Sequence, residues 1–306
     1  MDETKDRLTD HIDHDPDVEA RIERALEIRK AMGIYGRGGQ SERGFWKFAP
    51  VHAQAIFEYC FGIVWAQPLL DLKQREVIVI SVLAAQQLDG EVEWHVRSAL
   101  NLGLTREEIV EVLTQLSPYI GLPKTNHAFK AAVKAFESVD REKGIEPEKP
   151  SEDDPRDAEA EAAGDRIISQ VDLHPDVKDR IRKAFEVRQK LGIYGTGGQG
   201  GHGIYDLSPA HNQAIFEYCF GMVWNQPLLD IKTRELIVIA ASTANQCHNE
   251  LDQHVRSGLN AGLTRDEIIE AIAQCSPYIG LSKTNEGLRA AREAFERLDA
   301  QAGQKA

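Results

Sequence analysis

The feature that most constrains this chain is an internal repeat, because nearly the same segment occurs twice in its 306 residues. Residues 54–62 (QAIFEYCFG) return unchanged as residues 213–221, and the match continues without a gap from about Pro16 to Glu137. Repeats of solenoid proteins are shorter, about 20–45 residues, and more numerous. The repeat therefore predicts two tandem domains of one fold, residues 1–139 and 166–306.

The segment between the copies, residues 140–165, has a different composition (DREKGIEPEKPSEDDPRDAEAEAAGD). It is rich in Glu, Asp, Pro and Ala, so it offers little apolar surface to bury. We expect a solvated acidic linker.

Start and stop signals in both copies indicate helices. Asp15 before Pro16 predicts an N-cap with proline at the first helical position, opening a helix over residues 17–32. Thr105 and Thr264, each followed three residues later by Glu, are capping boxes. Residues 76–82 (EVIVISV) suit a strand by propensity, although the apolar run continues and favours a buried helix. We predict an all-α fold.

Charge and apolar runs bound the partners and the compartment. Acidic residues outnumber Lys and Arg by 49 to 36, a formal net charge of −13, which disfavours binding to nucleic acid or to an anionic membrane. The most apolar stretches, 77–85 and 236–244, are about half of a bilayer span, and the charged N-terminus has no signal segment. With four cysteines, too few for a disulfide framework, a cytoplasmic protein is expected.

Glu76, Glu91 and His95 form the sharpest candidate site. Glu91 and His95 are four residues apart and share one face of a helix. A carboxylate beside an imidazole raises its pKa and fixes its tautomer, which prepares a general acid–base group. Glu76 could turn towards the same point from the preceding helix, although an exposed surface pair is the simpler alternative. The second copy repeats the set as Glu235, Glu250 and His254.

The copies differ most just before these residues, where residues 88–90 are LDG and residues 247–249 are CHN. Cys247 near a helix start is a candidate nucleophile, because backbone N–H groups there favour a thiolate; a buried, inert thiol is the alternative. The remaining thiols, Cys60, Cys219 and Cys275, are predicted core residues.

Two further repeated pairs are candidates for binding substrate. His52 and His211 follow prolines that open helices, where they could orient a substrate carboxylate or serve as caps. Tyr119 and Tyr278 could line a pocket or simply pack. The candidate residues for substrate binding are therefore His52, His211, Tyr119 and Tyr278.

Cofactor and metal signals are weak. The glycine loops at 36–39 and 195–198 lack the dinucleotide and P-loop patterns. A metal site built from His211, Glu235, Glu250 and His254 is chemically possible, but acid–base chemistry already explains these residues. We expect no cofactor and no metal.

Two segments carry a family resemblance: residues 95–109 (HVRSALNLGLTREEI) and 119–129 (YIGLPKTNHAF), with YIGLSKTN at 278–285 in the second copy. They resemble the carboxymuconolactone decarboxylase family, within the alkylhydroperoxidase-like all-helical superfamily, and the resemblance covers most of both copies. It implies that residues 76–82 are helical and that the Glu–His groups line a pocket, often near a subunit contact. Assembly of three chains into a pseudo-hexamer is also implied.

The peroxidase branch of this superfamily carries Glu, eleven residues, then Cys-x-x-Cys-x-x-x-His. Here Glu235 is followed by Cys247, Glu250 and His254, and the first copy has neither cysteine. Turnover through a disulfide needs both sulfurs, so this departure argues against a peroxidase. Glu at the second position is similar to the decarboxylase-type members.

The resemblance implies a lyase acting on a small lactone or keto acid. In a carboxymuconolactone the carboxylate is conjugated through the ring alkene to the lactone carbonyl, so loss of CO₂ leaves a dienolate that must be stabilised and protonated. We assign His95 and His254 as acid–base groups, with Glu91 and Glu250 as their partners and Glu76 and Glu235 as second carboxylates. A thiol-dependent redox protein using Cys247 and a non-catalytic paralogue with an assembly role stay open.

Overall fold

The computed structural model describes residues 17–34, 49–145, 176–193 and 208–303, and within these ranges the only regular secondary structure is helical. The all-α prediction is therefore confirmed. The first repeat contains α2 (Val18–Ala31), α5 (Pro50–Ala55), η1 (Ile56–Val64), α6 (Leu72–Ala85), α7 (Asp89–Asn101), α8 (Arg106–Ile120) and α9 (Leu122–Glu142). The second contains α11 (Val177–Lys190), α13 (Pro209–Ala214), η3 (Ile215–Val223), α14 (Ile231–Asn245), α15 (His248–Ala261), α16 (Arg265–Gln274), α17 (Ser276–Ile279) and α18 (Leu281–Gly303).

The helix starts follow local capping chemistry. Thr105 and Thr264 form the two predicted capping boxes. The prediction that Asp15 caps the first helix is wrong: the cap is Asp17, whose carboxylate accepts from the backbone N–H of Glu19 at 2.9 Å. The Asp17 carboxylate also accepts from the backbone N–H of Ala20 at 3.4 Å, so it satisfies two of the donors that the first turn of a helix leaves without an intrahelical partner.

Residues 76–82 are helical, as the length of their apolar run predicted, in the middle of α6. All side chains from Arg75 to Ala85 are buried, so this part of α6 has no solvent-facing side. Burial on every side explains why neither helical nor strand periodicity is visible there, and why β-branched residues are tolerated in a helix.

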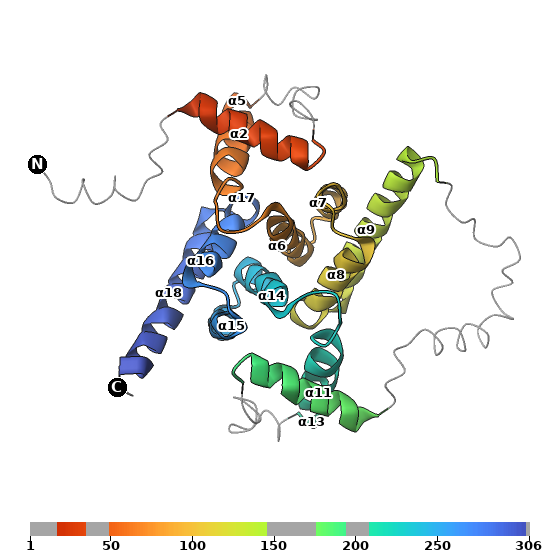
Figure 1. Ribbon diagram of the computed structural model, residues 1–306, viewed down its shortest axis with the longest axis vertical. Helices are drawn as coiled ribbons and strands as arrows, with labels where there is room; N and C mark the ends of the chain where they lie inside the picture. The colour runs from red at the N-terminus through yellow and green to blue at the C-terminus, as the bar shows by residue number, and fades with distance from the viewer. Residues whose placement is uncertain (1–16, 35–48, 146–175, 194–207, 304–306) are drawn as a thin grey trace, which may run out of the picture.

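Helices α6 and α14 lie side by side at the centre, with α7 and α15 next to them (Figure 1). The two cores share residues across the repeats: Ile237 and Ala241 pack in the cluster of the first repeat, and Ile78 and Val82 pack in that of the second. The repeats therefore form one body with an approximate two-fold arrangement, rather than two separate beads.

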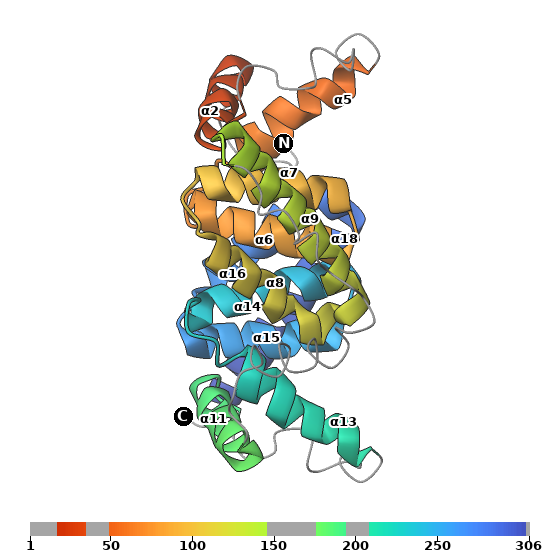
Figure 2. The ribbon, with the colours of Figure 1, turned by 90° about the vertical axis from the view of Figure 1, so that its right-hand side faces the viewer.

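Each repeat also has an arm that projects from this body. Helix α2 packs on η1, and α11 packs on η3, and the arms lie at opposite ends of the molecule (Figure 2). Gly62 in η1 allows the close approach, because a Cβ atom there would lie 2.6 Å from the carbonyl oxygen of Arg21. Gly221 and Arg180 repeat this contact in the second arm.

Buried ion pairs join one repeat to the other, and each pair together with its hydrogen-bonded neighbours is called a clasp below. Arg75 in α6 pairs with Glu270 in α16 and donates to Gln274 Oε1 at 2.7 Å. Glu270 also accepts from the backbone N–H of Leu70 at 3.0 Å. The matching clasp joins Arg234 to Glu111 and Gln115. Because all these charges are out of water and hydrogen-bonded, they fix the register in which the repeats meet.

The predicted linker and domain limits stay predictions. Helix α9 runs to Glu142, past the expected end of the first domain at residue 139. Most of residues 140–165 and both glycine loops lie outside the described residues. None of the described helices is both long enough and apolar enough to span a membrane.

Candidate active site

Each repeat contains a buried Glu–His pair at its centre. Helix α6 places Glu76 in the interior, α7 brings His95 against it, and Nδ1 of His95 lies 2.9 Å from Oε2 of Glu76. In the second repeat the corresponding distance, between His254 and Glu235, is 2.8 Å. A carboxylate at this distance accepts a hydrogen bond from Nδ1, which leaves Nε2 as the nitrogen that can exchange a proton with a substrate.

The carboxylate that directly contacts each imidazole is the buried one from the preceding helix, not the one four residues earlier on the same helix. Glu76, rather than Glu91, is the direct partner of His95; Glu91 is exposed and forms no ion pair with His95 in the described structure. Glu250 is half-exposed, and its Oε2 lies 3.9 Å from Nε2 of His254. The four-residue spacing placed these groups on one side of the helix, but the first turn of that helix is at the surface, whereas α6 supplies a carboxylate from the interior.

A tryptophan ring stacks on each imidazole. The ring of Trp65 stacks on His95 with centroids 6.1 Å apart, and Trp224 stacks on His254 at 5.9 Å. Both tryptophans follow the π-helical segments η1 and η3, a helix type that is rare and often found at functional sites. The sequence reasoning missed them, although their retention in both copies was a usable signal.

The tyrosines reach across the molecule. Tyr278 of the second repeat presents a ring edge to His95 of the first, with centroids 5.5 Å apart. Its oxygen accepts a hydrogen bond from Nε1 of Trp65 at 3.0 Å. Tyr119 of the first repeat contacts His254 in the same way, at 5.3 Å. Each predicted tyrosine therefore lies beside a Glu–His pair, but beside the pair of the opposite repeat.

Two of the cysteines predicted as core residues also border these clusters. Cys60 and Cys219 are half-buried on η1 and η3, and Sγ of Cys219 lies 3.9 Å from the Tyr119 oxygen. Burial raises the pKa of each of these two thiols to about 12, so both stay protonated at neutral pH. Cys275 is fully buried in the core, as predicted.

Burial also sets the charge of the pair. It raises the pKa of the Glu76 and Glu235 carboxyls, against the opposing effect of the imidazoles. Burial by itself lowers the pKa of His254, but the adjacent Glu235, with a smaller contribution from Glu250, outweighs it and raises that pKa overall. A net charge is costly in such an interior, and the carboxylate and the imidazole of each pair offset one another.

Other predicted residues lie away from the pairs. His52 and His211 are exposed on the short helices α5 and α13, which project at opposite ends of the molecule (Figure 2). Cys247 is exposed at the N-cap of α15. Within the described ranges no three His, Cys, Asp or Glu side chains gather as a metal site, and this includes the chemically possible set of His211, Glu235, Glu250 and His254.

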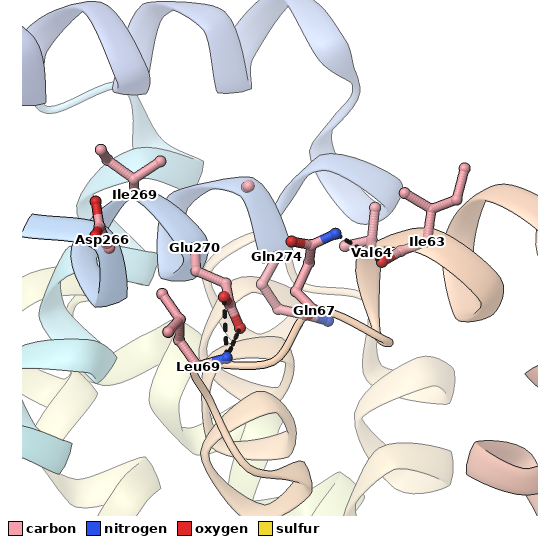
Figure 3. Close-up of a pocket in the computed structure, with 9 residues that line it drawn as sticks. Ile63, Val64, Gln67, Leu69, Asp266, Ile269, Glu270 and Gln274 are labelled. Carbon is pink, nitrogen blue, oxygen red and sulfur yellow. Dashed lines mark hydrogen bonds between the residues drawn. The ribbon is translucent and has the colours of Figure 1, made fainter. Parts of the chain in front are cut away.

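A separate cavity of about 340 Å³ opens between the repeats, beside the Arg75 clasp. Figure 3 shows that Glu270 and Gln274 reach into it from α16, opposite Leu69 and Gln67 of the first repeat. None of the predicted site residues lines it.

Comparisons with known proteins agree with the resemblance. The sequence profile of the carboxymuconolactone decarboxylase family matches residues 50–134 and 209–293, more than half of the chain. A 4-carboxymuconolactone decarboxylase from Acinetobacter baylyi is 31% identical over 135 residues, 98% of that protein and 44% of this chain. One repeat thus corresponds to a whole relative.

Two further proteins are similar. Nitrosuccinic acid decarboxylase from Metarhizium robertsii is 32% identical over 86 residues, which cover 28% of this chain and 60% of that protein. A crystal structure described as a putative gamma-carboxymuconolactone decarboxylase subunit from Burkholderia xenovorans shares the fold, with a TM-score of 0.53 and 20% identity over 95% of this chain and 99% of its own.

Proposed function

The chain belongs to the carboxymuconolactone decarboxylase family, and we propose that it is a cofactor-free acid–base lyase that removes CO₂ from a small lactone or keto acid. The observation that supports this most is the buried Glu–His pair, present once per repeat, in which Nδ1 is hydrogen-bonded to the buried carboxylate, while Nε2 of His254 lies 3.9 Å from the half-exposed Glu250. Decarboxylase-like activity is common to the named relatives, whereas the substrate and the mechanism are proposals.

The proposed step breaks the bond between the carboxylate carbon and the adjacent carbon. CO₂ leaves, and the electron pair passes into the conjugated carbonyl to form a dienolate. Protonated His95 or His254 then donates the proton on Nε2 to carbon, while Glu76 or Glu235 stabilises the imidazolium through Nδ1. Water returns a proton to the imidazole and completes the cycle.

The buried carboxylates are compatible with an anionic substrate because the pair as a whole is neutral. Glu76 faces an imidazole rather than open space, and burial disfavours any state with a net charge. Glu91 and Glu250 are at the surface, where water screens their charges. Both relatives named as decarboxylases act, by their names, on small carboxylic acids, and we infer the same class of substrate here.

The test is CO₂ release from a panel of small lactones and keto acids by the wild type, the two single variants H95Q and H254Q, and the double variant. Removing both acid–base groups should lower kcat/KM by about 100-fold or more. Melting curves report whether the variants fold. A folded double variant with wild-type turnover would contradict the proposal.

The thiol chemistry of Cys247 is the second candidate, because this is the one exposed cysteine in the described ranges. Consumption of peroxide by the wild type that is absent in C247S would establish this thiol chemistry. CO₂ release that persists in C247S would instead assign the lyase reaction to the Glu–His pairs. Roles for His52 and His211 in binding stay predictions.

We further propose that three chains assemble as a pseudo-hexamer. Large apolar side chains are exposed at matching positions of both repeats: Leu69 and Leu228, Val110 and Ile269, and Leu122 and Leu281. Such repeated exposure is expected of contact surfaces. Light scattering should give three times the 34.1 kDa mass of the chain, and a monomer would contradict this assembly.

A further inference from the structure

We propose that the two active sites are composite and crossed: Tyr278 serves His95, Tyr119 serves His254, and each phenol donates a hydrogen bond to the substrate oxygen on which negative charge develops. This inference rests on the proposed lyase function. It makes each repeat incomplete without the other, which gives a physical reason for two copies in one chain.

A single stripe of side chains creates the crossing. Glu111, Gln115 and Tyr119 are spaced four residues apart along α8, so they lie on one helical face. Glu111 and Gln115 bind Arg234 of the opposite repeat. The residue after Arg234 is Glu235, which binds His254, and Tyr119 contacts that histidine.

The second repeat supplies the same stripe in return. Glu270 and Gln274 hold Arg75, and Tyr278 meets His95, the partner of Glu76. In each repeat the Glu and the Gln of the clasp therefore precede the tyrosine by a few positions. These three residues lie on α8 in the first repeat and on the consecutive helices α16 and α17 in the second. The arrangement that joins the repeats also delivers each tyrosine to its imidazole.

The segment around each tyrosine is also fixed across the repeats. The hydroxyl of Ser276, two residues before Tyr278, hydrogen-bonds the hydroxyl of Tyr59 on η1, and Ser117 binds Tyr218 on η3 in the same way. These contacts hold the helical segments that carry the tyrosines, the end of α8 and α17, against the π-helices that lead to Trp65 and Trp224. The tyrosines are thus positioned by several independent bonds to the opposite repeat.

The hydrogen bonds of the phenol leave its proton available. Trp65 Nε1 donates to the oxygen of Tyr278 at 3.0 Å, and Trp224 donates to Tyr119 at 2.7 Å, so in each case the oxygen is the acceptor. The other hydrogen-bonding neighbour is a cysteine: the Cys219 thiol donates to the Tyr119 oxygen at 3.9 Å, a weak bond that does not use the phenol proton, and Cys60 is the corresponding neighbour of Tyr278. A substrate oxygen would accept a hydrogen bond from the phenol proton.

Burial further keeps each phenol in its donor form. It raises the pKa of Tyr278 and of Tyr119 well above the usual value, and the nearby thiol and carboxylate of each site act in the same direction. A phenol that stays neutral can donate to an oxyanion but cannot compete with the imidazole as a base. The two groups therefore have separate tasks, charge stabilisation by tyrosine and proton transfer by histidine.

Two double variants separate a crossed arrangement from an uncrossed one. H95Q/Y278F damages one site twice and leaves the other intact, whereas H95Q/Y119F damages both sites. We expect H95Q/Y278F to keep the turnover of H95Q, and H95Q/Y119F to fall about 100-fold below it, the loss typical of one oxyanion donor. The reciprocal pair, H254Q/Y119F and H254Q/Y278F, covers the case in which only one site is active.

The donor role has its own readout. Y278F in the H254Q background should lower kcat with KM little changed, because the bond forms to charge that is present only in the transition state. A purely structural role would instead lower the melting temperature. The proposal would be overturned if H95Q/Y278F and H95Q/Y119F had equal turnover, or if H95Q/Y119F kept the turnover of H95Q.

Imidazole NMR signals distinguish failure of this inference from failure of the lyase function. Y278F should shift the ring signals of His95 and leave those of His254 in place, and Y119F should do the reverse, whether or not a substrate is known. If both histidines fail to respond as crossed partners, the proposal is overturned regardless of turnover. If the shifts are crossed but no acid releases CO₂, only the lyase function fails.

Discussion

The two repeats agree at their Glu–His pairs and the residues that contact them, although other buried positions, such as Leu83 and Ser242, differ. The Glu–His pair, the stacked tryptophan, the tyrosine and the arginine clasp are identical in both, and their contact distances match closely. The differences gather at the start of the helix that carries the histidine, where LDG at 88–90 corresponds to CHN at 247–249. Trp94, whose surface is 63% exposed, corresponds to Gln253.

One surface pair is inverted between the copies. Asp89 contacts His127 at 3.1 Å in the first repeat, and the corresponding residues in the second are His248 and Glu286. An acid has become a base, and a base an acid. We infer that both copies keep the Glu–His pair and the residues that contact it because each of these buried side chains depends on the others. The exposed residues around each site vary because water solvates them independently.

The largest expected effect comes from breaking the clasp. Arg75→Ala leaves Glu270 buried without its cation, so we expect a loss of about 3–5 kcal/mol in the free energy of unfolding. If the interiors are equivalent, Arg234→Ala should cost a similar amount. Urea unfolding measures both.

The matched control is Arg97→Ala, which removes an ion pair with the exposed Glu142 and should cost less than about 1 kcal/mol. Equal costs for Arg75→Ala and for Arg97→Ala, whose arginine is half-buried, would show that the clasp does not join the repeats energetically.

The next effect compares the two carboxylates of one site. In an H254Q background, Glu76→Gln should lower kcat by about 100-fold, because the imidazolium loses the group that stabilises it. Glu91→Gln should change kcat little, since Glu91 is exposed and not paired with His95. The reverse order of effects would restore Glu91 as the working partner.

A smaller effect is expected in the pH dependence of stability. The pKa of His254 is raised in the folded protein, mainly by Glu235 against the effect of burial. The folded state therefore binds more protons above about pH 6.5, and this stabilisation is complete below that pH and is lost as pH rises through the folded pKa.

Glu235→Gln removes the main cause of the raised pKa of His254, and burial, which lowers that pKa, is then opposed only by the smaller contribution of Glu250. The difference in unfolding free energy between wild type and E235Q should fall as the pH rises from 6 to 9, measured by urea unfolding at each pH. Parallel stability curves would contradict the proposed coupling.

The smallest effect on stability should follow from exchanging the variable loop. Gln87 and Gln246 precede it with nearly the same left-handed φ, 57° and 59°, so the backbone can accept either sequence. Placing CHN at 88–90 should change the unfolding free energy by no more than about 0.5 kcal/mol. In an H254Q background it should move substrate preference towards that of the second site; unchanged preference would dissociate the loop from recognition.

Local chemistry alone was sufficient for much of the fold. The capping boxes at Thr105 and Thr264 follow from short stretches of sequence, because they depend on neighbours a few residues away. The duplication is visible by comparing the two copies, and the helix at 76–82 followed from the length of the apolar run rather than from residue propensity. The Asp15 cap was wrong for the same local reason, since Asp17 offers an equivalent carboxylate two residues later.

The sequence by itself determined that Glu76, His95 and Tyr278, with their counterparts, are repeated polar groups worth a functional explanation. Only the tertiary structure decided that Glu76 rather than Glu91 holds the imidazole, and that Tyr278 meets the histidine of the other copy. A helical repeat reports which residues share a face of one helix. Which helix lies against that face is set by burial and by ion pairs between residues some 200 positions apart, such as Arg75 and Glu270.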